Sequence, residues 1–254
     1  MAPPITVEAV VLSTTRYGET SRIARLATRE LGVVSAIAKG ALRPKSRIGS
    51  ALQPLSLGQG IIIPSRHSDL HLLTSFDVVH APLGLGAALE RWSAALALVE
   101  LMLRFAPADP HHEGYEALRD GLLEVEHADP DDIDAVGLRR LWDLIARLGF
   151  APALQACVID GLALSPEGPL PFSAREGGAL CPTCARTHPA AMLPAADRAD
   201  LVALLSADAP LPRPAPANAA AHRRLLVRFV RHQLGGDHPL PALDFWERRG
   251  WNDR

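Results

Sequence analysis

Five residues in the second half of the chain have the types and spacing of a metal site. Cys181 and Cys184 form a C-x-x-C pair, a spacing that lets two thiolates from one tight turn bind the same ion. Cys157 begins a C-x-x-D upstream, so Asp160 stands where a second C-x-x-C would place its last thiolate. His188 is an alternative fourth ligand, because zinc accepts imidazole or carboxylate beside thiolates. The pattern predicts a zinc-finger-like clip that holds Zn²⁺ through three sulfur ligands and one further ligand.

Other uses of these three cysteines stay open. The clip could be a remnant without metal, either empty or closed by a disulfide that leaves one cysteine over. A redox dithiol is disfavoured, because that motif usually opens a helix in a βαβ context and none is visible here. A site closed by four protein ligands would be structural, since no coordination position remains for a reacting water.

The segment that contains the clip, residues 154–190, interrupts a run of expected helices. Apolar periodicity, proline and acidic residues at starts, and glycine at ends mark these helices. We expect them at about residues 87–105, 115–125, 130–149, 195–205 and 219–234. The sequence thus predicts a mostly α-helical domain over residues 81–254, with the clip inserted in it.

The first 80 residues have a different period. Apolar and polar residues alternate in short runs separated by turns, which is typical of half-buried strands. We expect strands near residues 5–11, 21–28, 33–39, 61–63 and 70–78, and a polar loop at 40–51. Five such strands favour a small closed barrel of the OB-fold type, with an SH3-like barrel as the alternative. The predicted class is therefore α+β, with an N-terminal five-stranded barrel over residues 1–80 and a helical domain behind it.

Charge is distributed unevenly between these two parts. The net charge of the chain is −2, yet residues 1–80 carry nine basic and five acidic groups, 9 − 5 = +4. Basic side chains lie on the second strand, at the end of the third strand and in the loop after it. The candidates for contact with DNA are Arg22, Arg25, Lys39, Arg43, Lys45 and Arg47. Small barrels bind nucleic acid by tracking phosphates with such residues along one face. Few aromatic residues accompany them, which favours contact with the backbone over stacking on bases.

Catalytic motifs are missing from the sequence: it has no G-x-S-x-G, no P-loop and no H-E-x-x-H. Three cysteines in 254 residues exclude a disulfide framework and fit a reducing cytosol. Neither a signal peptide nor an apolar run of membrane-spanning length is visible. We therefore expect a non-enzymatic cytoplasmic protein, associated with the nucleoid and not with a membrane.

Several segments resemble the RecO family of bacterial recombination mediators in order and spacing. They are VEAVVLSTTRYGETSRI, LATRELGVVSAIAKGALRPKSR, LWDLIARLGFAPALQAC and FSAREGGALCPTC. The resemblance implies an N-terminal OB-fold, a helical C-terminal domain and a zinc site of four cysteines in many members. This chain departs from that pattern at Asp160, where the second cysteine would stand.

The resemblance also implies a function and partners. The chain would bind single- and double-stranded DNA, anneal complementary strands and, with RecR, help to load the recombinase onto DNA coated by single-stranded-DNA-binding protein. The acidic, apolar-ended tail of that coating protein would need an apolar groove rimmed with arginine. One candidate set for this groove is Arg139, Arg140, Trp142 and Arg147, and the arginines of residues 223–231 are another. The first set could equally be the basic end of a helix.

Two further functions remain as alternatives to a DNA-binding mediator. The cysteines could belong to a metal-dependent enzyme that acts on nucleic acid, or the chain could be an assembly scaffold without DNA contact.

Overall fold

A computed structural model of the chain describes residues 2–107, 109–235 and 238–248. It divides into two compact units, one of residues 1–88 with 98–127 and the other of residues 89–97 with 128–254.

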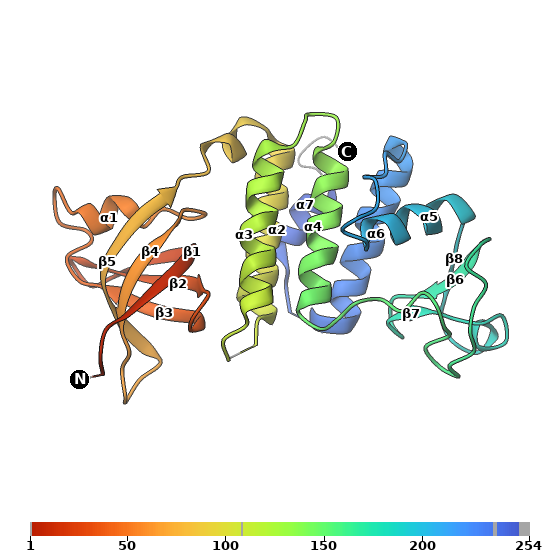
Figure 1. The fold of residues 1–254 in the computed structure, drawn as a ribbon, viewed down its shortest axis with the longest axis horizontal. Coiled ribbons are helices and arrows are strands. Elements are labelled where there is room, and N and C mark those ends of the chain that lie inside the picture. Colours follow the sequence, from red (N-terminus) through yellow and green to blue (C-terminus); the bar gives the residue numbers. More distant parts are fainter. Residues whose placement is uncertain (1, 108, 236–237, 249–254) are drawn as a thin grey trace. The chain divides into compact units, whose positions relative to one another are not determined.

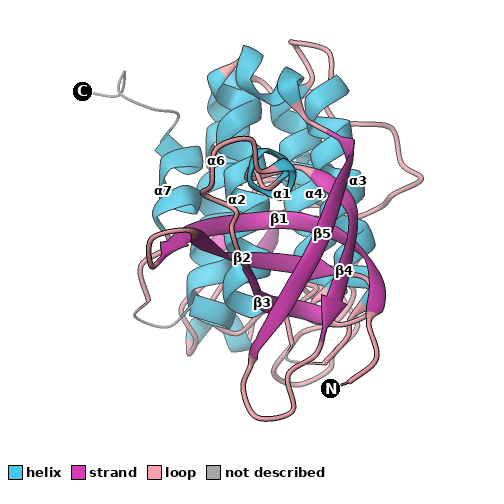
Figure 2. Cartoon of the chain, turned by 90° about the vertical axis from the view of Figure 1, so that its left-hand side faces the viewer, coloured by secondary structure: helices cyan, strands magenta, loops and turns pink. Residues whose placement is uncertain are grey.

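The first unit contains a closed barrel of five strands (Figure 1). The strands are β1 (Ile5–Tyr17), β2 (Ser21–Thr28), β3 (Gly32–Ala38), β4 (Leu57–Ile63) and β5 (Leu70–His80). Their order around the barrel is β1-β2-β3-β5-β4, and β4 pairs back onto β1 in antiparallel fashion. β3 and β5 form the one parallel pair of this barrel, which closes the ring. Figure 2 shows the strands crossing one another as they close. The predicted OB-type barrel is confirmed.

Apolar side chains that alternate along the strands fill the interior of the barrel. Val7, Ala9 and Val11 of β1 point inward and are fully buried, and Ala24 and Leu26 do the same on β2. Small inward alanines leave room for larger partners from the facing strands, and the barrel interior is thereby filled with side chains. A bulge between Val11 and Ser13 adds the twist that closure requires.

The loop expected at residues 40–51 contains a short helix, α1 (Arg47–Ala51). The Ser46 hydroxyl caps it by accepting a hydrogen bond from the Gly49 N–H at 3.2 Å. Ile48, Ala51 and the fully buried Leu52 pack against the barrel core. The loop is therefore anchored to the barrel.

A carboxylate joins the end of the barrel to the helical part of the first unit. That part holds the turn η1 (Leu83–Ala87), the second half of α2 (Leu89–Phe105) and α3 (His112–His127). Glu126 on α3 accepts a hydrogen bond from the Gly84 N–H at 2.8 Å and lies 2.6 Å from Nε2 of His80 on β5.

The second unit is mainly helical, as the sequence predicts. Besides the first half of α2, its helices are α4 (Ile133–Arg147), α5 (Ala195–Leu204), α6 (Pro216–Val230), the wider turn η3 (Arg231–Gly235) and α7 (Pro241–Arg248). The centre of its core is an edge-to-face contact between Trp142 of α4 and Phe229 of α6, with ring centroids 5.2 Å apart. No helix among residues 2–107, 109–235 and 238–248 is both long and apolar enough to cross a membrane.

A small antiparallel sheet interrupts the helices of this unit. It consists of β6 (Leu170–Ser173), β7 (Gly178–Ala179) and β8 (Ala191–Leu193) in the order β7-β6-β8, and the turn η2 (Cys184–Arg186) lies between β7 and β8. The sequence analysis expected the clip here but none of these strands.

Replacing Gly49 by alanine should destabilise the barrel. A Cβ atom at this buried position would lie 1.8 Å from the carbonyl oxygen of Ala41, which is backbone and cannot rotate away. We expect a loss of at least about 1–3 kcal/mol in the free energy of unfolding, the usual cost of overpacking. Denaturant unfolding followed by circular dichroism measures it. Gly86→Ala is the matched control, because a Cβ at Gly86 meets no atom within 4 Å. Equal stability of the two variants would contradict the packing of α1 against the loop.

Candidate metal centre and basic barrel loop

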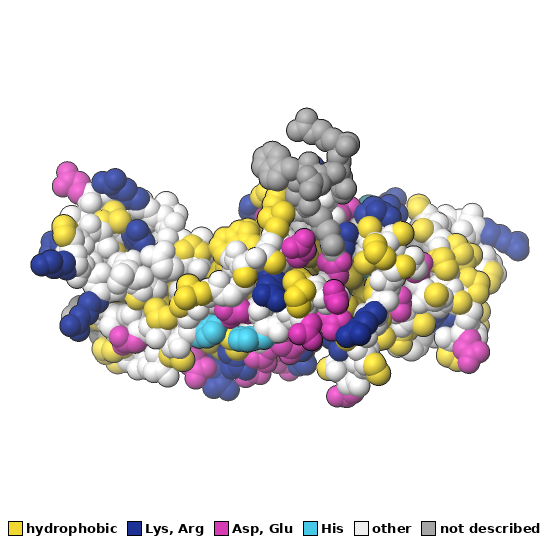
Figure 3. Space-filling model, turned by 90° about the horizontal axis from the view of Figure 1, so that it is seen from above, with side chains coloured by type: hydrophobic (Ala, Val, Ile, Leu, Met, Phe, Trp, Pro, Cys, Tyr) yellow, Lys and Arg dark blue, Asp and Glu magenta, His cyan; other side chains and the backbone are white. Residues whose placement is uncertain are grey.

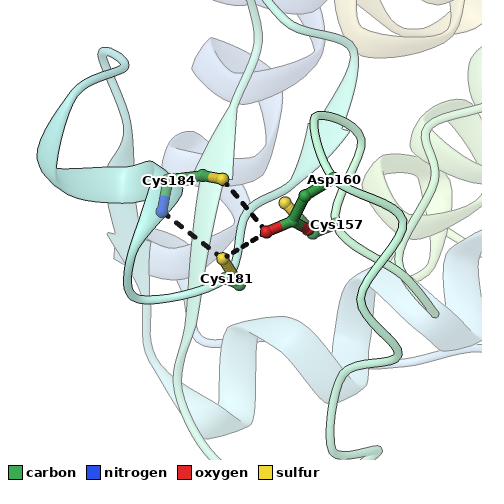
Figure 4. A group of neighbouring side chains, drawn as sticks. All are labelled: Cys157, Asp160, Cys181 and Cys184. Atoms are coloured by element: carbon green, nitrogen blue, oxygen red, sulfur yellow. Dashed lines mark hydrogen bonds between the residues drawn. The ribbon is translucent and has the colours of Figure 1, made fainter.

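Two tight turns bring the predicted metal ligands together (Figure 4). The first turn carries Cys157 and Asp160, and it closes through a hydrogen bond from the Gly161 N–H to the Cys157 carbonyl at 2.9 Å. The second turn carries Cys181 and Cys184, and the Cys184 N–H donates to Sγ of Cys181 at 3.4 Å. Backbone donors that point at a sulfur atom are typical of a metal-binding thiolate turn.

The four ligand atoms lie within 4.8 Å of one another. Oδ2 of Asp160 is 3.2 Å from Sγ of Cys181 and 3.3 Å from Sγ of Cys184. Its other oxygen accepts a hydrogen bond from the Leu162 N–H at 3.0 Å, which holds the carboxylate toward the sulfurs. The described residues thus form a group of three sulfurs and one carboxylate that could hold a metal ion.

Burial differs among the members of this group. Cys157 and Cys181 are buried, Cys184 is half-buried and Asp160 is exposed. Burial, together with the neighbouring Asp160 carboxylate, raises the pKa of Cys184 to about 12. The hydrogen bonds from Cys157 and from the Leu162 N–H lower the pKa of Asp160 well below its usual range. A cation among these groups would replace the thiol protons, because a coordinating thiol is deprotonated.

Burial also raises the pKa of Cys157, but backbone N–H donors from Asp160, Cys181 and Ile159 outweigh it, so the net shift is downward. The turn therefore favours the thiolate at Cys157, which is the form that binds metals.

His188, the alternative fourth ligand, lies outside this group. Its Nδ1 is 3.1 Å from the carbonyl oxygen of Cys184 and 3.1 Å from the hydroxyl of Thr187. The ring is therefore engaged with the backbone of its own turn, and Asp160 occupies the fourth place of the cluster.

The predicted DNA contacts in the loop after β3 are all exposed. We call residues 39–47 the basic loop, and its exposed cations are Lys39, Arg43, Lys45 and Arg47. No ion pair involves these four side chains in the part of the chain that the structure describes. Apolar Ala41 of the same loop is packed against the barrel core, so the cations are left on the outside. Figure 3 shows side chains of Lys and Arg at several places on the barrel.

Backbone hydrogen bonds hold the basic loop in a series of turns. The Leu42 N–H donates to the carbonyl of Thr20 at 2.8 Å, and the Ser46 N–H donates to the carbonyl of Arg43 at 3.1 Å. Lys45 has a φ of 64°, a left-handed conformation that is uncommon outside glycine. The loop therefore presents its charges from a fixed backbone.

The two predicted DNA contacts on β2 are already engaged in hydrogen bonds within the barrel unit. Nη1 of Arg22 lies 3.4 Å from the carbonyl of Gly49, and Nη1 of Arg25 lies 3.0 Å from the hydroxyl of Ser35. Both arginines are half-buried along the strand, next to the basic loop in the case of Arg22.

Sequence reasoning missed a cavity of about 460 Å³ that shares Lys39 with the basic loop. Its other basic lining residues come from the β4–β5 hairpin and are Arg66, His67 and His71. The parallel pairing of β3 with β5 brings this hairpin beside Lys39, and no local pattern announces that pairing.

The set predicted to bind a partner's tail does not form an open groove. Trp142 is fully buried, and its indole is in contact with Phe229. Arg139 donates to backbone carbonyls that include those of Ala203 and Ala209. Asp143 of the same helix forms ion pairs with both remaining arginines. Its Oδ2 lies 3.4 Å from Nη1 of Arg140, and its Oδ1 lies 3.4 Å from Nε of Arg147. Trp142 therefore does not line a groove for a partner's tail, because its side chain faces the core.

Known protein families match both parts of the chain. Residues 1–82 match the family described as "Recombination protein O N terminal", and residues 87–242 match "Recombination protein O C terminal". A "DNA repair protein RecO" of Anaeromyxobacter dehalogenans (strain 2CP-1 / ATCC BAA-258) is 37% identical over 232 residues, which are 89% of this chain and 90% of that protein.

Two further relatives carry the same description. One, of Anaeromyxobacter sp. (strain Fw109-5), is 33% identical over 248 residues, 92% of this chain and 93% of its own length. The other, of Nocardioides sp. (strain ATCC BAA-499 / JS614), is 34% identical over 253 residues, 95% and 98% of the two chains. Matches of this extent, on a chain with a five-stranded barrel and a helical unit, show that it belongs to the RecO family.

Proposed function

We propose that this chain is a DNA-binding recombination mediator in DNA repair. Residues 1–80 serve as its DNA-binding domain, and residues 81–254 form a helical domain braced by the clip of residues 154–190. It binds single- and double-stranded DNA, anneals complementary strands and, with RecR, helps to load the recombinase onto DNA coated by single-stranded-DNA-binding protein. The observation that carries this proposal is the fixed, exposed basic loop on a closed OB-type barrel.

Annealing has a simple physical basis in such a surface. Two complementary strands repel one another through their phosphates, and a cationic surface that contacts both lowers this repulsion. Base pairing then supplies the driving force, so the protein needs no nucleophile and no general base. Tyr17 is the exposed aromatic residue of β1, and with so little stacking surface the contacts fall mainly on phosphates.

Removing the charges of the basic loop should weaken DNA binding. We expect the variant with Lys39, Arg43, Lys45 and Arg47 all replaced by alanine to bind single-stranded DNA at least about tenfold more weakly at low salt. The slope of log affinity against log salt should fall by up to about 3, because each lost phosphate contact removes about 0.7. Binding measured by fluorescence anisotropy across a salt series gives both quantities.

A matched control changes four exposed arginines outside residues 1–80 to alanine, namely Arg104, Arg175, Arg186 and Arg248. The same change in net charge should leave the affinity within about twofold, because none of these side chains belongs to the proposed phosphate contacts. If the control loses as much affinity as the loop variant, the binding surface is not the basic loop.

The clip is proposed to hold a structural Zn²⁺ through Cys157, Cys181, Cys184 and Asp160. Three thiolates and a carboxylate suit this ion, and with four protein ligands no position is left for a reacting water. The ion would neutralise groups whose charges are held close together and join two turns that are far apart in sequence. It would contribute stability and no chemistry.

Substitution of the fourth ligand tests this assignment. We expect Asp160→Ala to weaken zinc binding at least about tenfold, on the scale of altered metal sites. His188→Ala is the matched control and should leave the affinity unchanged, because its ring lies outside the cluster. Competition with a chromophoric chelator measures both affinities. Loss of affinity in the His188 variant alone would exchange the roles of the two residues.

A small cavity of the second unit fits an acidic, apolar-ended tail such as that of single-stranded-DNA-binding protein. The cavity has a volume of about 200 Å³ and an apolar floor that includes Phe172 and Leu225. Arg175, Arg228 and His232 line the same cavity, and both arginines are exposed. Arg228 is one of the arginines of residues 223–231, the second candidate set for binding this tail. Trp142 of the first candidate set is buried and cannot contact a partner.

Changing the arginines of this cavity should weaken binding of the tail peptide. We expect Arg175→Ala/Arg228→Ala to lower its affinity at least about fivefold, because a desolvated charge-assisted contact contributes about 1 kcal/mol or more. Isothermal titration with a peptide of that tail measures the change. Arg140→Ala/Arg147→Ala is the control and should leave the affinity unchanged. An effect confined to the control would move the site to α4.

A nuclease assay with and without chelator, together with the DNA-binding series, separates the competing functions. A metal-dependent enzyme would show turnover of nucleic acid that chelation abolishes, whereas a structural clip loses stability only. A scaffold would bind no DNA at any salt concentration.

A further inference from the structure

A second cluster of metal-ligand side chains lies on the helices behind the clip. Asp197 and Asp200 project from one face of α5, three residues apart, and His222 faces them from α6. One ligand atom from each residue lies within 4.8 Å of the others. Nε2 of His222 is 3.9 Å from Oδ1 of Asp197 and 3.9 Å from Oδ2 of Asp200.

The histidine of this cluster has no hydrogen bond to satisfy it. His222 is 2% exposed, and neither of its ring nitrogens has a hydrogen-bond partner among the described residues. Its Nε2 lies 3.9 Å from one oxygen of each carboxylate, which is too long for a hydrogen bond. Burial lowers the pKa of His222 and outweighs the opposite effect of the Asp197 and Asp200 carboxylates.

The spacing suits an ion between the three groups. Metal–nitrogen and metal–oxygen bonds of about 2.0–2.2 Å place two donor atoms up to about 4.4 Å apart. Separations of 3.9 Å therefore leave room for a single ion that contacts the imidazole and both carboxylates. Nδ2 of Asn218 donates to Oδ1 of Asp197 at 2.7 Å, which orients that carboxylate as outer-shell partners of metal ligands do.

A cavity gives this cluster access to solvent. It has a volume of about 180 Å³, and Asp197 and His222 lie on its wall. Arg224 and Arg228 line the same cavity and are exposed, so their charges oppose a cation. Two carboxylates at the ion itself outweigh them, because both arginines are screened by water.

We propose that Asp197, Asp200 and His222 form a second divalent-metal site, of nitrogen and oxygen ligands, that joins α5 to α6. The ligand set suits Zn²⁺ or Mn²⁺ better than Mg²⁺, which takes oxygen ligands and keeps its waters. The inference stands independently of the proposed function and of the sulfur clip.

Cobalt distinguishes the two sites within one protein. The metal-stripped full chain is titrated with Co²⁺, and bound metal is counted by equilibrium dialysis while absorbance is recorded. Thiolate ligation gives an intense sulfur-to-cobalt charge-transfer band, whereas a site of nitrogen and oxygen gives none. We expect two equivalents per chain, of which only one produces this band.

Variants assign the silent equivalent. Asp200→Asn keeps the shape of a partly exposed side chain, and we expect it to weaken the silent equivalent at least about tenfold while the charge-transfer band stays unchanged. His222→Gln should do the same. Asp208→Asn, an exposed change just beyond α5, is the control and should alter neither equivalent. The proposal is overturned if the wild-type chain binds no silent equivalent, or if that equivalent survives both Asp200→Asn and His222→Gln.

Discussion

Burial of apolar residues at one end of the barrel is the constraint on which the rest of this structure depends. Ala41, Ile48 and Leu52 pack against the barrel core. The chain between β3 and β4 must therefore cross that end with its apolar side chains inward. The interleaved Lys39, Arg43, Lys45 and Arg47 are left outside as a consequence. One packing requirement thus stabilises the fold and also builds the cationic surface.

That surface is a fixed arrangement of like charges. Turns and the Ser46 cap hold the backbone, and Lys45 keeps a left-handed conformation. Neighbouring cations repel one another, and a polyanion that contacts several of them relieves this repulsion while it releases counterions. A rigid loop also loses little conformational entropy on binding. In the clip of the second unit, by contrast, three sulfurs and a carboxylate lie close together.

The sequence predicts the barrel well because each strand carries its own alternating pattern, as in Val7, Ala9 and Val11. It misses α1, because five residues make little more than one helical turn, which is too short for a repeating apolar pattern. The sheet of β6, β7 and β8 is also missed. Its strands have only two to four residues, and their pairing partners are distant in sequence. Spacing alone leaves Asp160 and His188 equivalent as ligands. The folded turns distinguish them, because Asp160 lies among the sulfurs while the ring of His188 contacts its own turn. The cluster of Asp197 with His222 joins two helices, so no local motif predicts it. The burial of Trp142 is not predicted either, because an apolar stripe does not indicate which of its side chains are accessible to a partner.

The chain offers a direct measurement of its central claim, that the basic loop is the surface on which DNA lies. Lys39 and Lys45 are the only lysines of this sequence, so among its side chains an amine-selective reagent labels this loop alone. Labelling with and without saturating single-stranded DNA, read by mass spectrometry, should show both lysines protected and the protection lost at high salt. The reactivity of both lysines at high salt without DNA serves as the reference. If both lysines react equally with and without bound DNA, the loop does not contact DNA and the account is wrong.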